Sequence, residues 1–171
     1  MRVKLFGLLL LIVTQTALAA WAQATPAKQH PTPEETVRRY KDATPATQEN
    51  AKKLKKLGLA AFYFAEAHDW KFVFTAETFQ DALKPYAKDD TIFYADDGKK
   101  QPFALNTNFV GIDFDKLASP STIVMFYQGR DRKLDFMHQG YGLVCSGDGH
   151  VSLISKEESK ALRWTTEIKE K

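Results

Sequence analysis

The chain has 171 residues, of which 44% are hydrophobic and 26% are charged, and its formal net charge is +3. This composition is typical of one globular domain and excludes a disordered or fibrous chain. The basic cluster of Lys52, Lys53, Lys55 and Lys56 suits a solvated helix face, so we expect no nucleic-acid partner. Cys145 is the sole cysteine, which excludes an internal disulfide.

The first residues have the layout of a secretory signal peptide. Arg2 and Lys4 precede an apolar run over residues 5–13, and small residues follow over 17–24. The apolar run is shorter than the roughly 20 residues needed to cross a bilayer. We therefore predict a signal peptide over residues 1–24.

Cleavage of this leader is expected near Ala24, which would leave a secreted or periplasmic protein. Its loss would reduce the basic residues from 24 to 22, against 21 acidic ones, so the net charge gives little indication of a partner. The alternative is an uncleaved anchor over residues 5–22. A membrane would then be contacted only through the leader.

Residues 25–44 contain three prolines among charged and small residues, which predicts an extended spacer with a short helix over 34–41. Thr44 and Pro45 then supply a cap and a first-turn proline, so a long helix is expected to begin there and to end near His68. Its apolar residues recur at helical spacing: Leu54, Leu57, Ala61, Phe64 and Ala65.

Shorter elements follow. We expect a helix over 77–87 and a closing helix over 155–164, where Ser155 and Glu158 have the spacing of a capping box. Between them, short runs of aromatic and branched residues are separated by turn residues, which predicts an antiparallel sheet. The expected strands are 91–94, 103–105, 122–127, 141–145 and 151–154. Residues 45–171 would form one α+β domain.

A spaced pattern near the C-terminus points to a family. His138 is followed by nine residues and then by Asp148 and Gly149, and His150 and Val151 continue into an apolar run. This pattern resembles the signature of the prepilin-type processing-associated proteins, which are bacterial pseudopilin-like proteins. The resemblance implies a pilin-like α+β fold, in which a long N-terminal helix packs on a small antiparallel sheet with short extra helices.

Further segments extend the resemblance over about residues 50–155. They are similar to family segments in the same order, at residues 54–60, 64–65, 68–69, 83–86, 103–106 and 119–124.

Two departures from the family pattern matter. The prepilin leader is missing, because Phe6 and Gly7 lie inside the apolar run and no glutamate follows them. Ala51 and Ala95 stand where family members tend to carry cysteines. The resemblance therefore implies the fold but not assembly into a filament.

The signature itself is most simply structural. Asp148-Gly149 between two apolar runs predicts a tight hairpin turn with positive φ at both central residues. A straight strand from His138 would place its imidazole about 33 Å from Asp148, too far to share a metal. A metal site of His138, Asp148 and His150 would need a bend, which Gly140 and Gly142 would permit.

Other candidate sites are weaker. Cys145 lies in an apolar run, which favours a small buried residue over a nucleophile. The acidic loops at 96–98 and 113–115 suggest calcium, since secretion pseudopilins hold calcium in a loop, but they lack the ligand spacing of an EF-hand. Hydrolase, zinc-protease and phosphate-loop motifs are absent. We therefore expect no enzyme activity and no cofactor, with calcium or another divalent metal as the open alternative.

Three functions fit these features. The first, which we favour, is an exported non-enzymatic pseudopilin-like domain that binds an unidentified protein partner or contributes to an assembly of the bacterial envelope or secretion apparatus. The second is a component of a type II or type IV secretion pseudopilus that still assembles, which needs an uncleaved N-terminus. The third is a periplasmic metal-binding or hydrolytic protein that uses His138, Asp148 and His150.

Overall fold

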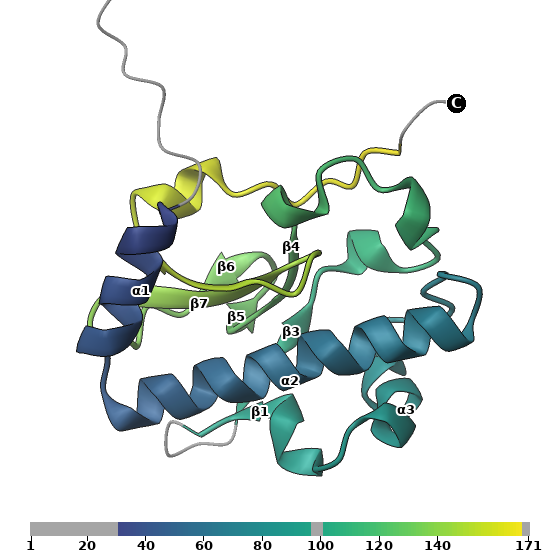
Figure 1. Ribbon diagram of the computed structural model, residues 1–171, viewed down its shortest axis with the longest axis horizontal. Helices are drawn as coiled ribbons and strands as arrows, with labels where there is room; N and C mark the ends of the chain where they lie inside the picture. The colour runs from purple at the N-terminus through teal and green to yellow at the C-terminus, as the bar shows by residue number, and fades with distance from the viewer. Residues whose placement is uncertain (1–30, 97–100, 169–171) are drawn as a thin grey trace, which may run out of the picture.

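The computed structural model describes residues 31–96 and 101–168, so the predicted signal peptide over 1–24 and its cleavage site lie outside the described residues. The described part is a mixed α+β structure with small antiparallel sheets, which confirms the predicted α+β class. Helices α1 (Pro33–Asp42) and α2 (Pro45–Ala67) pack on a four-stranded sheet, and short helical turns surround it (Figure 1).

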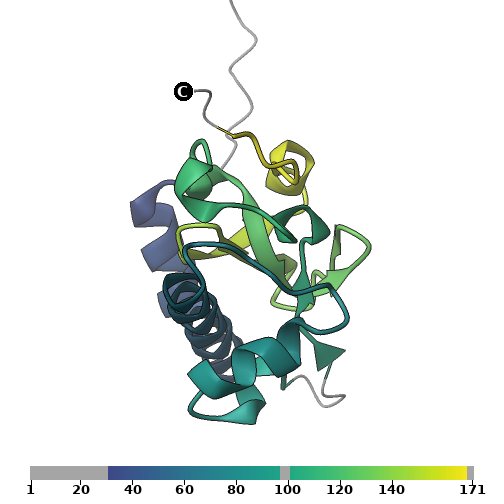
Figure 2. The same cartoon turned by 90° about the vertical axis from the view of Figure 1, so that its right-hand side faces the viewer.

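Helix α2 begins and ends where the sequence predicts. Its N-cap Thr44 accepts a hydrogen bond from the backbone N–H of Thr47, and Pro45 occupies the first turn. One face of the helix is buried against the sheet, as Figure 2 shows in a view along the helix. The buried apolar residues are Ala51, Leu54, Leu57, Gly58, Ala60, Ala61, Phe64 and Ala65.

The finer prediction of a pilin-like fold with a long N-terminal helix is not confirmed, since α2 has 23 residues and begins only at Pro45. The chain turns at Ala43, whose backbone is extended, and Thr44 starts a new helix. A separate helix precedes it because Pro45 has no N–H to donate to an upstream carbonyl, which interrupts the helical hydrogen-bond ladder.

Helix α1 corrects the predicted extended spacer over 25–44 in its described part, since residues 25–30 lie outside the described residues. The short helix expected at 34–41 is present, with Thr32 and Glu35 forming a reciprocal capping box. It is also docked on the domain, because the Arg39 guanidinium forms a two-pronged ion pair with Glu158 and donates to the carbonyl of Leu153 at 2.7 Å. Residues 33–42 therefore belong to the folded unit.

The main sheet has the strand order β3-β4-β7-β8, and all its pairs are antiparallel. Helix α2 covers one face, and a smaller apolar cluster around Tyr127, Ile154 and Leu162 covers the other. The strands are β3 (Ala104–Leu105), β4 (Val124–Tyr127), β7 (Tyr141–Ser146) and β8 (Val151–Ser155). Two small hairpins flank it: β1 (Tyr94–Ala95) with β2 (Gln101–Pro102), and β5 (Gly129–Arg130) with β6 (Lys133–Leu134).

One predicted element is wrong in type, and another is shorter than predicted. The expected strand at 91–94 is mostly the 3₁₀ helix η2 (Asp90–Phe93), because the Asp89 carboxylate accepts from the Thr91 N–H and starts a helical turn. The expected helix at 155–164 shrinks to the 3₁₀ helix η6 (Glu158–Ala161).

The capping pair of Ser155 and Glu158 does form, with both reciprocal hydrogen bonds. The chain then leaves the helical path because the Arg163 carbonyl accepts from the Val124 N–H at the edge of β4. The predicted helix at 77–87 is split into α3 (Phe79–Leu83) and η1 (Lys84–Tyr86), with Pro85 in the second part. The other 3₁₀ turns are η3 (Thr107–Phe109), η4 (Phe114–Lys116) and η5 (Pro120–Thr122).

Within the part of the chain that the structure describes, no helix is both long and apolar enough to span a bilayer.

Candidate functional site

His138, the first signature residue, is buried at the start of the sheet, with 6% of its surface exposed. Its Nδ1 atom lies 3.0 Å from Thr47 Oγ1, and its Nε2 atom lies 2.6 Å from Gln128 Oε1. An amide oxygen only accepts, so Nε2 carries a hydrogen and donates it to Gln128. His138 therefore connects the first turn of α2 to the residue that follows β4.

The simplest prediction assumed a strand that runs straight from His138 to Asp148, but the structure has a turn directly after His138. His138 and Tyr141 exchange two backbone hydrogen bonds around Gln139 and Gly140, whose φ angles are +54° and +85°. This tight turn provides a bend at Gly140, and β7 begins directly after it. His138 consequently lies beside the first residue of β7.

Asp148 and Gly149 lie at the opposite end of β7, in the hairpin loop to β8. The Gly149 N–H donates to the Ser146 carbonyl, and the Ser146 N–H donates to the His150 carbonyl, both at 2.8 Å. Gly149 has φ +76°, whereas Asp148 is not in the positive region. The hairpin turn is thus confirmed, but it is a three-residue loop with one left-handed glycine rather than a turn with two.

This loop packs against α2. The Lys55 ammonium donates to the Gly149 carbonyl at 2.8 Å. A Cβ atom added at Gly149 would lie 2.8 Å from Cε2 of Phe62, and one added at Gly58 would lie 2.9 Å from Sγ of Cys145. The two glycines therefore let helix and hairpin approach more closely than any side chain would allow.

The structure does not bring together His138, Asp148 and His150, the candidate ligands of the alternative metal site. Five residue steps of β7 separate Tyr141, beside His138, from Ser146, so the strand holds the two ends about 17 Å apart. Asp148 Oδ1 accepts a hydrogen bond from the backbone N–H of His150 at 2.9 Å. Among residues 31–96 and 101–168, no three His, Cys, Asp or Glu side chains are grouped so as to hold a metal.

Cys145 does not have the environment of a nucleophile. Its side chain is fully buried under α2, and burial raises the pKa of the thiol to about 12. The thiolate is therefore strongly disfavoured at neutral pH. The residue acts as a small apolar group that fits beneath Gly58.

In the described part of the two acidic loops, one aspartate of each loop forms an ion pair with a lysine. The Asp96 carboxylate lies 3.8 Å from Lys53 Nζ, while Asp97 and Gly98 lie outside the described residues. The Asp113 carboxylate lies 2.5 Å from the Lys116 ammonium, and this hydrogen bond lowers the pKa of Asp113. Asp96 and Asp113 are thus used in ion pairs with nearby cations.

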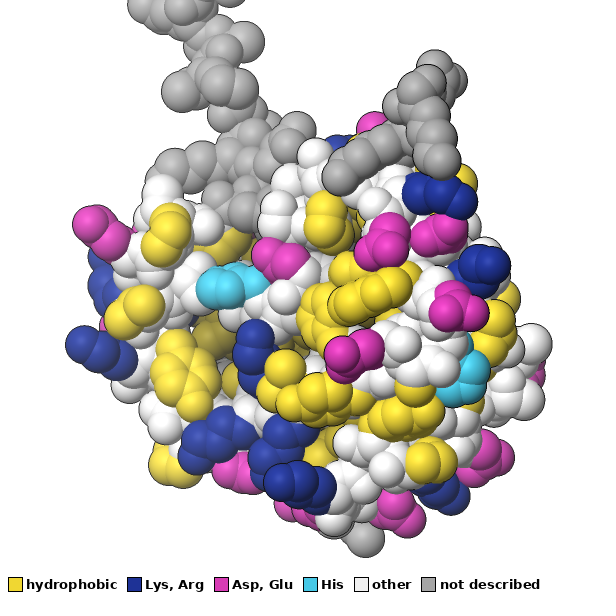
Figure 3. Space-filling view, turned by 45° about the vertical axis from the view of Figure 1, so that its right-hand side comes forward, with side chains coloured by type: hydrophobic (Ala, Val, Ile, Leu, Met, Phe, Trp, Pro, Cys, Tyr) yellow, Lys and Arg dark blue, Asp and Glu magenta, His cyan; other side chains and the backbone are white. Residues whose placement is uncertain are grey.

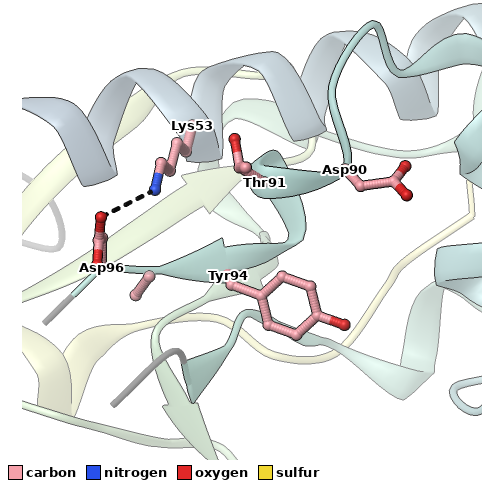
Figure 4. A pocket seen from close by; sticks show the side chains of 6 residues that line it. Lys53, Asp90, Thr91, Tyr94 and Asp96 are labelled. Carbon is pink, nitrogen blue, oxygen red and sulfur yellow. Dashed lines mark ion pairs between the residues drawn. The ribbon is translucent and has the colours of Figure 1, made fainter. Parts of the chain in front are cut away.

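Figure 4 shows the hollow of about 350 Å³ beside Lys53 and Asp96. These two side chains point toward one another, whereas those of Asp90 and Tyr94 point away from them. The polar groups do not converge on a common point, so the hollow lacks the arrangement of a catalytic or metal site.

Sequence reasoning missed one surface feature. The lysine cluster of α2 was expected to be a solvated helix face. Three of its members, Lys52, Lys55 and Lys56, instead border a hollow of about 470 Å³. Tyr40 and Val151 line the same hollow. The lysine cluster was visible in the sequence, but its apolar neighbours come from α1 and β8, which lie far away along the chain.

Comparisons with protein-family models, with curated proteins and with solved structures find no match to this chain.

Proposed function

We propose that this chain is an exported, non-enzymatic pseudopilin-like domain that acts as a binding or assembly component of the bacterial envelope or secretion apparatus. The observation that carries the proposal is that the signature residues contact helix α2 at two points. His138 is bonded to Thr47 at the start of α2, while Gly149 packs on Phe62 further along the same helix.

The signature therefore serves to fix a helix across a sheet. His138 is buried and bonded through both ring nitrogens, and the Asp148 side chain is engaged by its own turn. Side chains used in this way stabilise a fold, whereas catalysis requires polar groups that converge on a substrate. A pilin-like arrangement, in which an N-terminal helix covers an antiparallel sheet as α2 does here, is consistent with this use.

A surface for a partner is available on the outer side of α2. The aromatic residues in and just after the last turns of α2 are divided, since Phe64 and Phe72 are buried while Tyr63 and Trp70 are exposed. Figure 3 shows apolar side chains gathered on this face of the molecule. We define the outer apolar patch as Leu59 and Tyr63, which are exposed and lie one turn apart on the same face of α2. Exposed apolar patches of this kind mark sites of protein association.

Export is tested by intact-mass analysis of the protein from a host with a functional secretion pathway. We expect a mass that begins at Thr25, recovered from the periplasm or the medium. A mass that retains residues 1–24 would instead support a membrane-held assembly component.

Partner binding is tested with a photo-crosslinking amino acid at Tyr63 in the outer apolar patch. The matched control is the same substitution at Met137, which is also exposed but lies in the β6–β7 connection. We expect adducts with an identified envelope or secretion protein from Tyr63 and none from Met137. Equal labelling from both sites would contradict a specific surface. A metal that is lost on His138→Ala would support the metal-binding alternative instead.

A further inference from the structure

A second surface feature lies between α1, the first half of α2 and the β7–β8 hairpin. Two hollows of about 360 and 470 Å³ adjoin there and share Tyr40, Ala51, His150 and Val151. We call them together the α1–α2 groove. In Figure 3 a hollow on the left of the view has apolar side chains at its base and basic side chains at its edge.

The groove is held open by the docking of α1. Arg39 binds Glu158 and the Leu153 carbonyl, and its guanidinium lies 4.9 Å from the centre of the Tyr141 ring. These contacts fix α1 at the edge of β8, while α2 packs on the sheet by its opposite face. Tyr40 then stands between the two helices as the apolar wall of the groove.

The two ends of the groove differ in polarity. The end beside α1 and β8 is lined mainly by apolar groups that include Val37, Leu143 and Leu153, and it has a single lysine, Lys41, in its lining. At the other end are Lys52 and, one turn further along α2, the adjacent Lys55 and Lys56.

These lysines are poorly neutralised. Lys52 has an exposed partner, Glu49, at 3.5 Å, and the Asp89 carboxylate attracts Lys56 without forming a close ion pair with it. Within the described part of the chain, no carboxylate forms an ion pair with Lys55 or Lys56. The ammonium of Lys55 is held beside the groove by the Gly149 carbonyl. The groove therefore combines an apolar trough with a fixed excess of positive charge at one end.

We propose that the α1–α2 groove binds an anionic amphiphile with one aliphatic chain, namely a long-chain carboxylate. The carboxylate lies among Lys52, Lys55 and Lys56, and the chain lies along Tyr40 toward Leu153. The volumes are those of small-ligand sites. This inference is independent of the pseudopilin-like assignment.

The test is calorimetric titration of the full chain with dodecanoate below its micelle concentration. We expect one binding site, with affinity falling about fourfold for each methylene removed as dodecanoate is replaced by decanoate and octanoate. We expect 1-dodecanol, which has the same chain without the charge, to bind more weakly. Affinity that does not depend on chain length would overturn the proposal.

Variants locate the site. The double variant K52Q/K56Q removes two exposed charges without touching the core, and we expect it to weaken dodecanoate binding about fivefold while leaving 1-dodecanol unchanged. The matched control K88Q/K160Q, which removes two exposed lysines outside the groove, should bind dodecanoate as the parent does. An equal loss in both variants would overturn the assignment. So would tighter binding of an acidic amphipathic peptide than of dodecanoate, since that result would assign the groove to a protein segment.

Discussion

Replacement of His138 by alanine tests the structural interpretation of the signature most directly. The imidazole is buried, and it bonds to Thr47 Oγ1 at 3.0 Å and to Gln128 Oε1 at 2.6 Å. Each buried hydrogen bond contributes about 0.5–1.5 kcal/mol, and loss of the ring leaves a cavity that costs more. We expect the free energy of unfolding to fall by about 2–4 kcal/mol.

The measurement is urea unfolding followed by tryptophan fluorescence, together with thermal melting. For a domain of this size the expected loss corresponds to a melting temperature lowered by roughly 5–15 °C. His150→Ala is the matched control, because His150 is exposed and belongs to the same signature. Its free energy of unfolding should change by no more than about 0.5 kcal/mol.

A double-mutant cycle separates the hydrogen bond from the cavity. Thr47→Val removes the hydroxyl that contacts His138, and the two variants together should lose less stability than the sum of the single losses. A His138→Ala protein with a loss below about 0.5 kcal/mol, or with a changed metal content at unchanged stability, would refute the structural role.

Three further results are expected. Gly149→Ala should lower stability by about 2 kcal/mol more than Gly111→Ala in urea unfolding, because both have positive φ but only Gly149 would place its Cβ against an aromatic ring. Burial opposes ionisation of Glu158, but hydrogen bonds from Arg39 and the Ser155 turn prevail and lower its pKa. The ionised carboxylate therefore contributes to the stability of the fold above the ordinary carboxyl pKa. This contribution is lost as the pH falls through the lowered pKa. Glu158→Gln should thus be less stable than the parent by on the order of 1 kcal/mol at neutral pH, and this gap should narrow below about pH 4; a gap that does not depend on pH would contradict it. The Cys145 thiol should react with a thiol reagent only at the rate of unfolding, so rapid labelling of the folded protein would show that it is accessible.

Much of the fold followed from local patterns. The cap at Thr44, the proline at Pro45 and the helical recurrence of buried residues predicted α2. The branched and aromatic runs predicted β4, β7 and β8, although the ends differ by a residue or two. These elements are long enough for their periodicity to be read, and their burial in the structure agrees with it.

The shorter elements were harder to predict. The run at 91–94 has the composition of a strand, yet the Asp89 side chain and the burial of Ile92 and Phe93 favour a helical turn. The segment after Ser155 begins with the right capping pair, but it is drawn into pairing with the edge of β4. Short segments have little intrinsic preference, so tertiary contacts decide their conformation.

The sequence by itself determined the order of the main elements and the turn at Asp148-Gly149, because these depend on neighbours in the chain. It also excluded an internal disulfide, because the chain has one cysteine. Only the tertiary structure decided that His138 bonds to Thr47, that Arg39 holds α1 against Glu158, and that a lysine-bordered groove forms between α1 and α2. Those contacts join residues that lie about 90 to 120 positions apart. Their geometry depends on how the helices pack on the sheet, which no local pattern encodes.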